Sequence, residues 1–140
     1  MRILIAEDDM ASRRFLMKFL KEYGECDITV DGAEALEAFL LSHRENNPYD
    51  LVCLDIMMPK LDGTKVLKAI REIEKDKKIE AENRTKIIMI TALNDSGNVY
   101  SSFDIGCEGY AVKPINIEKL IEVLGKLGFE KTAKEKQEEI

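Results

Sequence analysis

The chain has 140 residues, a length that fits one domain with a single sizeable core. It carries 21 Lys and Arg against 27 Asp and Glu, and this formal net charge of −6 argues against direct binding of nucleic acid. Its apolar runs span only a few residues and an acidic residue comes as early as Glu7, so we expect no membrane segment and no secretory signal. A cytoplasmic protein is the resulting prediction.

The first part of the chain reads as two strand–helix units. The run Arg2–Ala6 is continuously apolar, which predicts a strand buried on both faces, and a helical period follows over 15–23. Cys26–Val30 alternates with polar residues, a pattern that suits a strand at the edge of a sheet. Asp31, with Glu34 three residues later, has the form of a capping box and predicts the start of the next helix.

The remaining elements continue the same alternation. In order, the pattern predicts a strand at Leu51–Leu54, a helix with apolar residues from Val66 to Ile73, a strand at Ile87–Ile90, a helix over about 95–105, a strand at Gly109–Val112, and a last helix, capped by Asn116, with apolar residues from Ile117 to Leu127. Five strands that alternate with helices predict an α/β fold, with helices on both faces of a parallel sheet.

Two segments of this pattern stand apart. The helix over 95–105 is rich in Ser, Gly and Asn, and only four residues can anchor it: Val99, Tyr100, Phe103 and Ile105. The stretch Glu72–Lys86 is highly charged, and we expect it to form a surface extension away from any site. The end of the chain is also charged, which predicts a tail over 129–140 after a domain that spans 1–128.

Polar residues interrupt the apolar pattern where the predicted strands end. The first strand is followed by three acidic residues, the third and fourth each close on a polar residue, and the fifth is followed by a lysine: Glu7, Asp8, Asp9, Asp55, Thr91 and Lys113. In open α/β sheets ligands bind at the carboxyl ends of the strands, so these side chains are predicted to share one pocket.

The chemistry of such a pocket follows from its charges. Two carboxylates about 5 Å apart repel each other by roughly 3 kcal/mol at an effective dielectric constant of about 20, and Lys113 offsets only part of this. A hard divalent cation relieves the repulsion, and oxygen ligands suit Mg²⁺. A metal, an ammonium group and a hydroxyl together match the needs of phosphoryl transfer, with one carboxylate as the nucleophile.

The chain resembles the receiver domains of bacterial response regulators over roughly residues 1–128. Four motifs carry the resemblance: Ile3-Leu-Ile-Ala-Glu-Asp-Asp9, Leu54-Asp-Ile-Met-Met-Pro-Lys-Leu-Asp-Gly63, Ile90-Thr-Ala92 and Gly109-Tyr-Ala-Val-Lys-Pro114. This resemblance implies a flavodoxin-like sheet of strand order 2-1-3-4-5 with five helices. It also implies two-component signalling, in the single-domain form that chemotaxis regulators have.

The resemblance further implies a role for each site residue. Asp55 would accept the phosphoryl group, and Mg²⁺ would be held by Glu7, Asp8, Asp55 and the main-chain carbonyl of Met57. Thr91, Lys113 and the main-chain N–H of Ala92 would contact the phosphoryl oxygens. Tyr110 would be the aromatic switch that turns inward with Thr91, Asp9 would cap a helix, and the Lys113–Pro114 peptide would be cis.

The implied partners are a histidine kinase or phosphotransfer protein and an output protein that the sequence does not name. A dimer through the fourth helix, fifth strand and fifth helix is a further prediction. The chain is either a stand-alone receiver or a fragment of a longer protein, and the sequence leaves both open. Met57 and Leu93 lie two residues past Asp55 and Thr91, and neither side chain can orient a water molecule by hydrogen bonding. We therefore expect a long-lived phosphoryl group.

Two alternatives keep the same fold. A Mg²⁺-dependent phosphohydrolase would turn over small phosphate esters, and such enzymes usually carry a second carboxylate two residues after the nucleophile, where this chain has Met57. A pseudo-receiver would keep the fold as an interaction module without the chemistry, but Asp8, Asp55, Thr91 and Lys113 are all present. A stoichiometric switch, not a turnover enzyme, is therefore the prediction.

Overall fold

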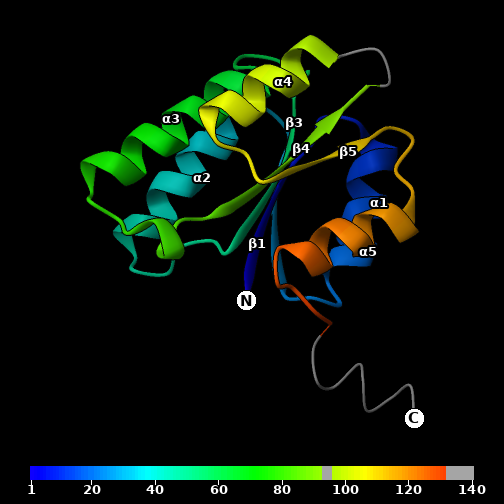
Figure 1. The fold of residues 1–140 in the computed structure, drawn as a ribbon, viewed down its shortest axis with the longest axis horizontal. Coiled ribbons are helices and arrows are strands. Elements are labelled where there is room, and N and C mark those ends of the chain that lie inside the picture. Colours follow the sequence, from blue (N-terminus) through cyan, green and yellow to red (C-terminus); the bar gives the residue numbers. More distant parts are fainter. Residues whose placement is uncertain (93–95, 132–140) are drawn as a thin grey trace.

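The computed structural model describes residues 1–92 and 96–131, and of residues 96 and 98–100 the backbone alone. The elements in chain order are β1 (Arg2–Ala6), α1 (Met10–Leu20), β2 (Glu25–Thr29), α2 (Gly32–Arg44), β3 (Leu51–Asp55), α3 (Gly63–Asp76), a short 3-10 helix (Ala81–Asn83), β4 (Lys86–Thr91), α4 (Ser96–Ile105), β5 (Gly109–Val112) and α5 (Ile117–Lys126). The strands form one parallel sheet of order β2-β1-β3-β4-β5, with helices on both faces, as predicted (Figure 1).

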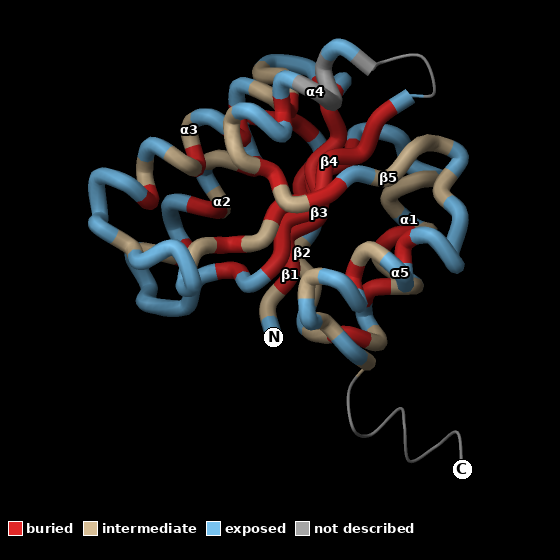
Figure 2. The backbone as a smooth tube through the Cα atoms, in the orientation of Figure 1, coloured by how far each residue is buried: buried red, intermediate tan, exposed pale blue. Residues whose placement is uncertain are grey.

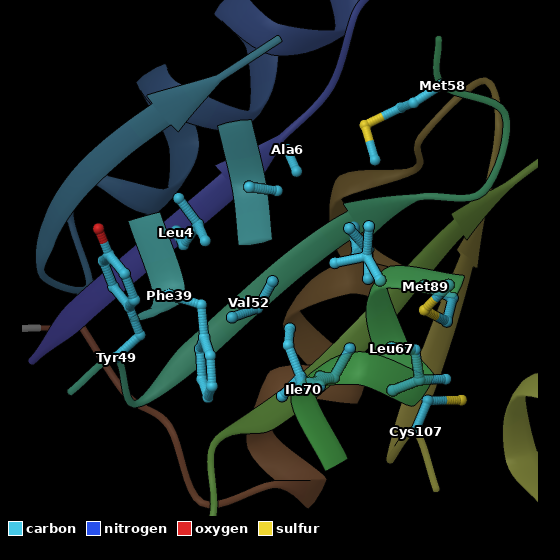
Figure 3. Packing of buried hydrophobic residues seen from close by; sticks show 14 of the residues in the cluster. Leu4, Ala6, Phe39, Tyr49, Val52, Met58, Leu67, Ile70, Met89 and Cys107 are labelled. Carbon is cyan, nitrogen blue, oxygen red and sulfur yellow. The ribbon is translucent and has the colours of Figure 1, made fainter. Parts of the chain in front are cut away.

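The sheet divides the core into two apolar clusters. On one face α2 and α3 pack against the sheet through Phe39, Leu67 and Ile70, and Figure 3 shows this cluster closely. On the other face α1 and α5 contribute Leu16 and Leu120. The central strands are buried along their length (Figure 2), which explains why their sequences are apolar without alternation.

Helix starts in this fold are fixed by capping side chains. Asp9 accepts a hydrogen bond from the Ser12 N–H, Asp31 from Glu34 and Asn116 from Lys119, and Asp62 caps α3 in the same way. These bonds satisfy N–H groups that have no partner within the helix. The predicted caps at Asp9, Asp31 and Asn116 are confirmed.

Element ends differ slightly from the prediction. β3 and β4 each extend one residue further than expected, so Asp55 and Thr91 are the last residues of their strands. β2 covers Glu25–Thr29, one residue earlier than predicted. The Lys113–Pro114 peptide is cis, as the resemblance implies.

Two sequence-based expectations about packing are wrong. Phe103 does not anchor α4, because its side chain is 42% exposed, while Val99 and Tyr100 lie among the residues whose side chains are not described. The stretch 72–86 is not uniformly a surface extension, since Glu74 and Thr85 are buried. Across residues 1–92 and 96–131, no helix has the length and apolar character that a bilayer span requires.

Candidate functional site

The sheet brings the predicted site residues together at its carboxyl edge. Glu7 directly follows β1, Asp55 ends β3, Thr91 ends β4 and Lys113 directly follows β5. The chain is held here by main-chain bonds beyond the strands, because Lys113 N–H donates to the Thr91 carbonyl at 2.8 Å. Parallel pairing therefore aligns the ends of four strands around one pocket.

Three carboxylates form an acidic cluster in this pocket. Glu7, Asp8 and Asp55 each offer one oxygen atom, and these atoms all lie within 4.8 Å of one another. Glu7 and Asp55 are buried, whereas Asp8 is exposed at the mouth of the pocket. Asp9 points its carboxylate at the N-terminus of α1 and serves as its cap.

Lys113 supplies the positive charge of the pocket. Its Nζ lies 2.9 Å from Glu7 Oε1 and 3.3 Å from Asp55 Oδ2, so one ammonium group bridges both buried carboxylates. Burial lowers the pKa of Lys113, but the hydrogen bond to Glu7 and the charges of Asp55 and Glu7 outweigh it and raise this pKa above its usual value. Lys113 therefore stays charged.

The Asp55 carboxylate is not fully neutralised by this contact. Burial raises the pKa of Asp55 to about 7, and the negative charge of Glu7 adds to the rise, whereas Lys113 opposes it. One ammonium facing several carboxylates leaves the pocket with excess negative charge near neutral pH. Such a pocket attracts a cation.

One buried carboxylate oxygen, Glu7 Oε2, indicates whether the residues of this site suit a metal ion. Glu7 Oε2 is buried and makes no hydrogen bond with any of the residues that the structure describes, although Glu7 Oε1 accepts from both Lys113 and the Asp9 N–H. A buried carboxylate oxygen without a partner is unfavourable. A metal-bound water or a metal ion would supply that partner, so the residues present fit Mg²⁺.

The loop after β3 shapes the surroundings of Asp55. Met57 N–H donates to Asp55 Oδ1 at 3.2 Å, and the Met57 side chain is 68% exposed at the rim. The loop closes tightly, because Gly63 N–H donates to the Ile56 carbonyl at 2.8 Å. A Cβ at Gly63 would clash with the Asp55 carbonyl, so only glycine allows this approach.

Thr91 and Tyr110 differ in burial, and no hydrogen bond joins their side chains in the described part of the chain. Thr91 is buried and its Oγ1 donates to the Ala92 carbonyl at 3.3 Å. The Tyr110 side chain instead points outward, 43% exposed, with its ring against Phe103. Leu93 lies outside the described residues.

Arg13 is a residue of this site that the motifs do not indicate. From α1, its Nη1 donates to the main-chain carbonyls of Glu7 at 3.2 Å and Asp8 at 3.3 Å. It therefore holds the main chain that carries the acidic pair. A basic residue four positions after a helix cap is a common helix-surface pattern, so the sequence alone gives no signal for this contact.

Comparison with known proteins agrees with this architecture. The family model described as response regulator receiver domain matches residues 3–125. The response regulator ArlR of Staphylococcus saprophyticus is 35% identical over 121 residues, which cover 86% of this chain and 49% of that protein. The probable transcriptional regulator ycf27 of Cyanophora paradoxa is 37% identical over 120 residues, which cover 85% of this chain and 44% of that protein. The chain thus spans about half the length of these curated relatives.

Solved structures agree as well. The receiver domain of Saccharomyces cerevisiae Ssk1, crystallised with the histidine phosphotransfer protein Ypd1, is 25% identical with a TM-score of 0.73 and covers 89% of this chain and 86% of that one. A receiver domain protein of Methanospirillum hungatei is 28% identical with a TM-score of 0.72, covering 89% of this chain and 90% of that one.

Proposed function

Because the chain belongs to the response regulator receiver domain family of two-component signalling, we propose that it is a phosphorylation switch whose acceptor is Asp55. The observation that carries this proposal is the placement of Asp55 beside Lys113 and next to the carboxylates of Glu7 and Asp8. A carboxylate next to a fixed ammonium and a cation site is suited to attack a phosphoryl group.

The proposed metal site consists of Glu7, Asp8, Asp55 and the Met57 main-chain carbonyl. Glu7 would act through a bound water that fills the unmet hydrogen bond of its Oε2, and Asp8 would be a direct ligand. When bound, Mg²⁺ would neutralise charge on the phosphoryl oxygens and lower the repulsion between the carboxylates.

The protein's own residues then divide the work of transfer. An Asp55 carboxylate oxygen attacks phosphorus and forms a P–O bond, while the P–N bond to the imidazole of the donor histidine breaks and the electron pair leaves with that nitrogen. Lys113, Thr91 and the Ala92 N–H would contact the phosphoryl oxygens. Tyr110 would turn inward as Thr91 moves toward the phosphoryl group.

We propose a stoichiometric switch and not a turnover enzyme. Asp55 has the exposed thioether of Met57 two positions later and no acid/base group there, which counts against a phosphohydrolase. We also expect the phosphoryl group on Asp55 to be long-lived, because the Met57 side chain cannot orient an attacking water molecule by hydrogen bonding.

The proposed phosphoryl donor is a histidine kinase or a histidine phosphotransfer protein. The Ssk1 receiver domain was crystallised with a protein of the second kind, and its fold superimposes on this chain. The output protein is unnamed, and we propose no nucleic-acid or membrane contact by this domain. Three further points about this chain stay predictions. They are a cytoplasmic location, a division into a domain over 1–128 and a tail over 129–140, and the single-domain form that chemotaxis regulators have.

The α4–β5–α5 face is the proposed surface for output or for a dimer. It holds a groove of about 680 Å³ that is lined on α5 by Lys119, Glu122 and Lys126 and on the other side by Phe103 and Tyr110. Aromatic residues such as Phe103 and Tyr110 are enriched at protein–protein interfaces.

The test is phosphorylation of the purified chain by acetyl phosphate with Mg²⁺, read by intact mass. We expect one added phosphoryl group in the native chain, none in Asp55→Asn, and none after chelation of the metal. An added group that persists in Asp55→Asn would contradict Asp55 as acceptor. Release of many equivalents of inorganic phosphate per chain from a small ester would instead favour the phosphohydrolase, and absence of both modification and Mg²⁺ binding would favour the pseudo-receiver.

A further inference from the structure

Tyr110 points outward and pairs with one aromatic ring, that of Phe103, among the side chains that the structure describes. Its ring and that of Phe103 in α4 are 5.8 Å apart between centroids with planes at 87°, an edge-to-face pair. Both side chains are more than 40% exposed, at 42% for Phe103 and 43% for Tyr110. Edge-to-face pairs are favourable beyond the area that they bury, so Phe103 stabilises the outward position.

The main chain that carries Phe103 is anchored by hydrogen bonds at the C-terminal end of α4. Gly106 and Cys107 N–H groups both donate to the Ser102 carbonyl at 2.9 and 3.0 Å, which closes the helix. The Gly106 carbonyl then accepts from Arg71 Nε at 3.0 Å and Nη2 at 2.8 Å. Phe103 thus sits one turn before an anchored helix end.

Arg71 is itself fixed in place. Its side chain is 13% exposed, and its guanidinium forms ion pairs with Glu74 at 2.6 Å and Glu108 at 2.8 Å. It also donates to the carbonyl of Thr85, directly before β4, at 2.9 Å. The helix end that carries Phe103 is therefore tied to α3, to β4 and to the segment before β5.

We propose that Phe103 is a positioning residue, a latch that holds Tyr110 outward and so lowers the resting population of the inward, signalling-competent form. The inference rests on the proposed function, in which Tyr110 turns inward when Asp55 is phosphorylated. Turning inward breaks the contact with Phe103, because that contact involves an outward ring. Removing the Phe103 ring therefore favours the inward form.

If Phe103 acts as this latch, its removal should raise the affinity for a phosphoryl mimic instead of lowering it. An aromatic pair of this kind corresponds to roughly a two- to tenfold change in a conformational ratio. A ligand that binds only the inward form gains apparent affinity in proportion to the population of that form. Phe103→Ala is thus expected to bind a phosphoryl mimic more tightly, whereas mere structural damage would weaken binding.

The experiment titrates the full chain, with Mg²⁺, with beryllium trifluoride as the phosphoryl mimic and follows amide resonances near Asp55. We expect the apparent Kd to fall about two- to tenfold in Phe103→Ala and to stay near the native value in Phe103→Tyr, which keeps the ring. Ile121→Ala is the matched control, since Ile121 is an equally exposed apolar residue of α5, at 43%. In a Tyr110→Ala background, the effect of Phe103→Ala should vanish.

A second measurement needs no ligand. Three-bond couplings from the main-chain nitrogen and carbonyl to the Tyr110 ring carbon report its side-chain rotamer, and Phe103→Ala should populate a second rotamer. An unchanged or weaker Kd, or a rotamer that stays as in the native chain, overturns the latch. If the native chain fails to bind the mimic, the proposed function is contradicted. The Tyr110 rotamer populations, which need no ligand, still show whether Phe103 holds Tyr110 outward.

Discussion

Lys113 and Glu7 are joined by a 2.9 Å contact between Nζ and Oε1, although they stand 106 positions apart in the chain. The contact spans the carboxyl edge of the sheet from the end of β1 to the end of the edge strand β5. It places one ammonium group between the buried oxygens of Glu7 and Asp55. Several expected outcomes depend on this charge balance.

Replacement of Lys113 by Met should destabilise the metal-free protein, since it leaves two buried carboxylates without their cation. We expect a loss of about 2 kcal/mol in the free energy of unfolding at pH 8, measured by urea titration in chelator. Added Mg²⁺ should restore most of it. Lys126→Met is the control, because its ion pair with Glu122 is exposed, and an equal loss there would contradict the argument.

Asp55→Asn should stabilise the metal-free fold at neutral pH. The pKa of Asp55 is raised from 3.8 to about 7, so the folded chain binds this proton more tightly than the unfolded chain does. Stability from this group is therefore complete below about pH 4 and is lost as the pH rises to about 7. The difference between Asp55→Asn and the native chain should grow over that range to about 1–3 kcal/mol and then stay level. A difference independent of pH would contradict the raised pKa.

The neighbouring residues Asp8 and Asp9 should separate metal binding from helix capping. Asp8→Asn is expected to weaken Mg²⁺ binding at least tenfold with little change in melting temperature. Asp9→Ala removes the bond to Ser12 N–H and should lower the melting temperature by a few degrees, with Mg²⁺ affinity kept. Calorimetric titration measures Mg²⁺ affinity, and thermal melts measure stability. Weaker Mg²⁺ binding in Asp9→Ala together with a lower melting temperature in Asp8→Asn would contradict these roles.

The phosphoryl group on Asp55 is expected to persist for minutes or more without a phosphatase. Met57→Gln introduces a side chain that can orient a water, so the half-life followed by intact mass should become several-fold shorter. Met10→Gln is a suitable control, being an equally polar change at another exposed methionine. Loss from the native chain within a few seconds would refute the proposed long lifetime.

Arg71→Met should be one of the most damaging changes outside the site. It leaves Glu74, which is fully buried, and the partly buried Glu108 without their cation. We expect a loss of about 3–5 kcal/mol in urea unfolding. Arg14 is exposed, so Arg14→Met should change stability by less than about 0.5 kcal/mol. Equal effects would show that the buried ion pairs add nothing.

The fold and the positions of the polar residues at the strand ends were predictable because one sequence pattern determines both. Alternating apolar runs and helical periods predict a parallel sheet, and a parallel sheet places Asp55, Thr91 and Lys113 at one edge. The prediction required no knowledge of side-chain geometry. It therefore succeeded for residues at strand ends, where the main chain alone determines position.

The remaining features depend on side-chain geometry that periodicity does not encode. Glu74 falls on the apolar stripe of α3, four residues after Ile70 and seven after Leu67, and that position was the available signal of burial. Its charged neighbours in the sequence obscured it. The outward rotamer of Tyr110 and its contact with Phe103 have no sequence signature at all.

The contact between Lys113 and Glu7 also determines when the site can form during protein synthesis. The ribosome synthesises Glu7, Asp8 and Asp55 well before Lys113, so a nascent chain carries the acidic groups before the ammonium group that offsets their charge. Only when β5 joins the sheet is the charge balance complete. Under the proposed function, a chain that ends before residue 113 would lack Lys113 and would not accept a phosphoryl group on Asp55, so the switch would become competent only once the domain is complete.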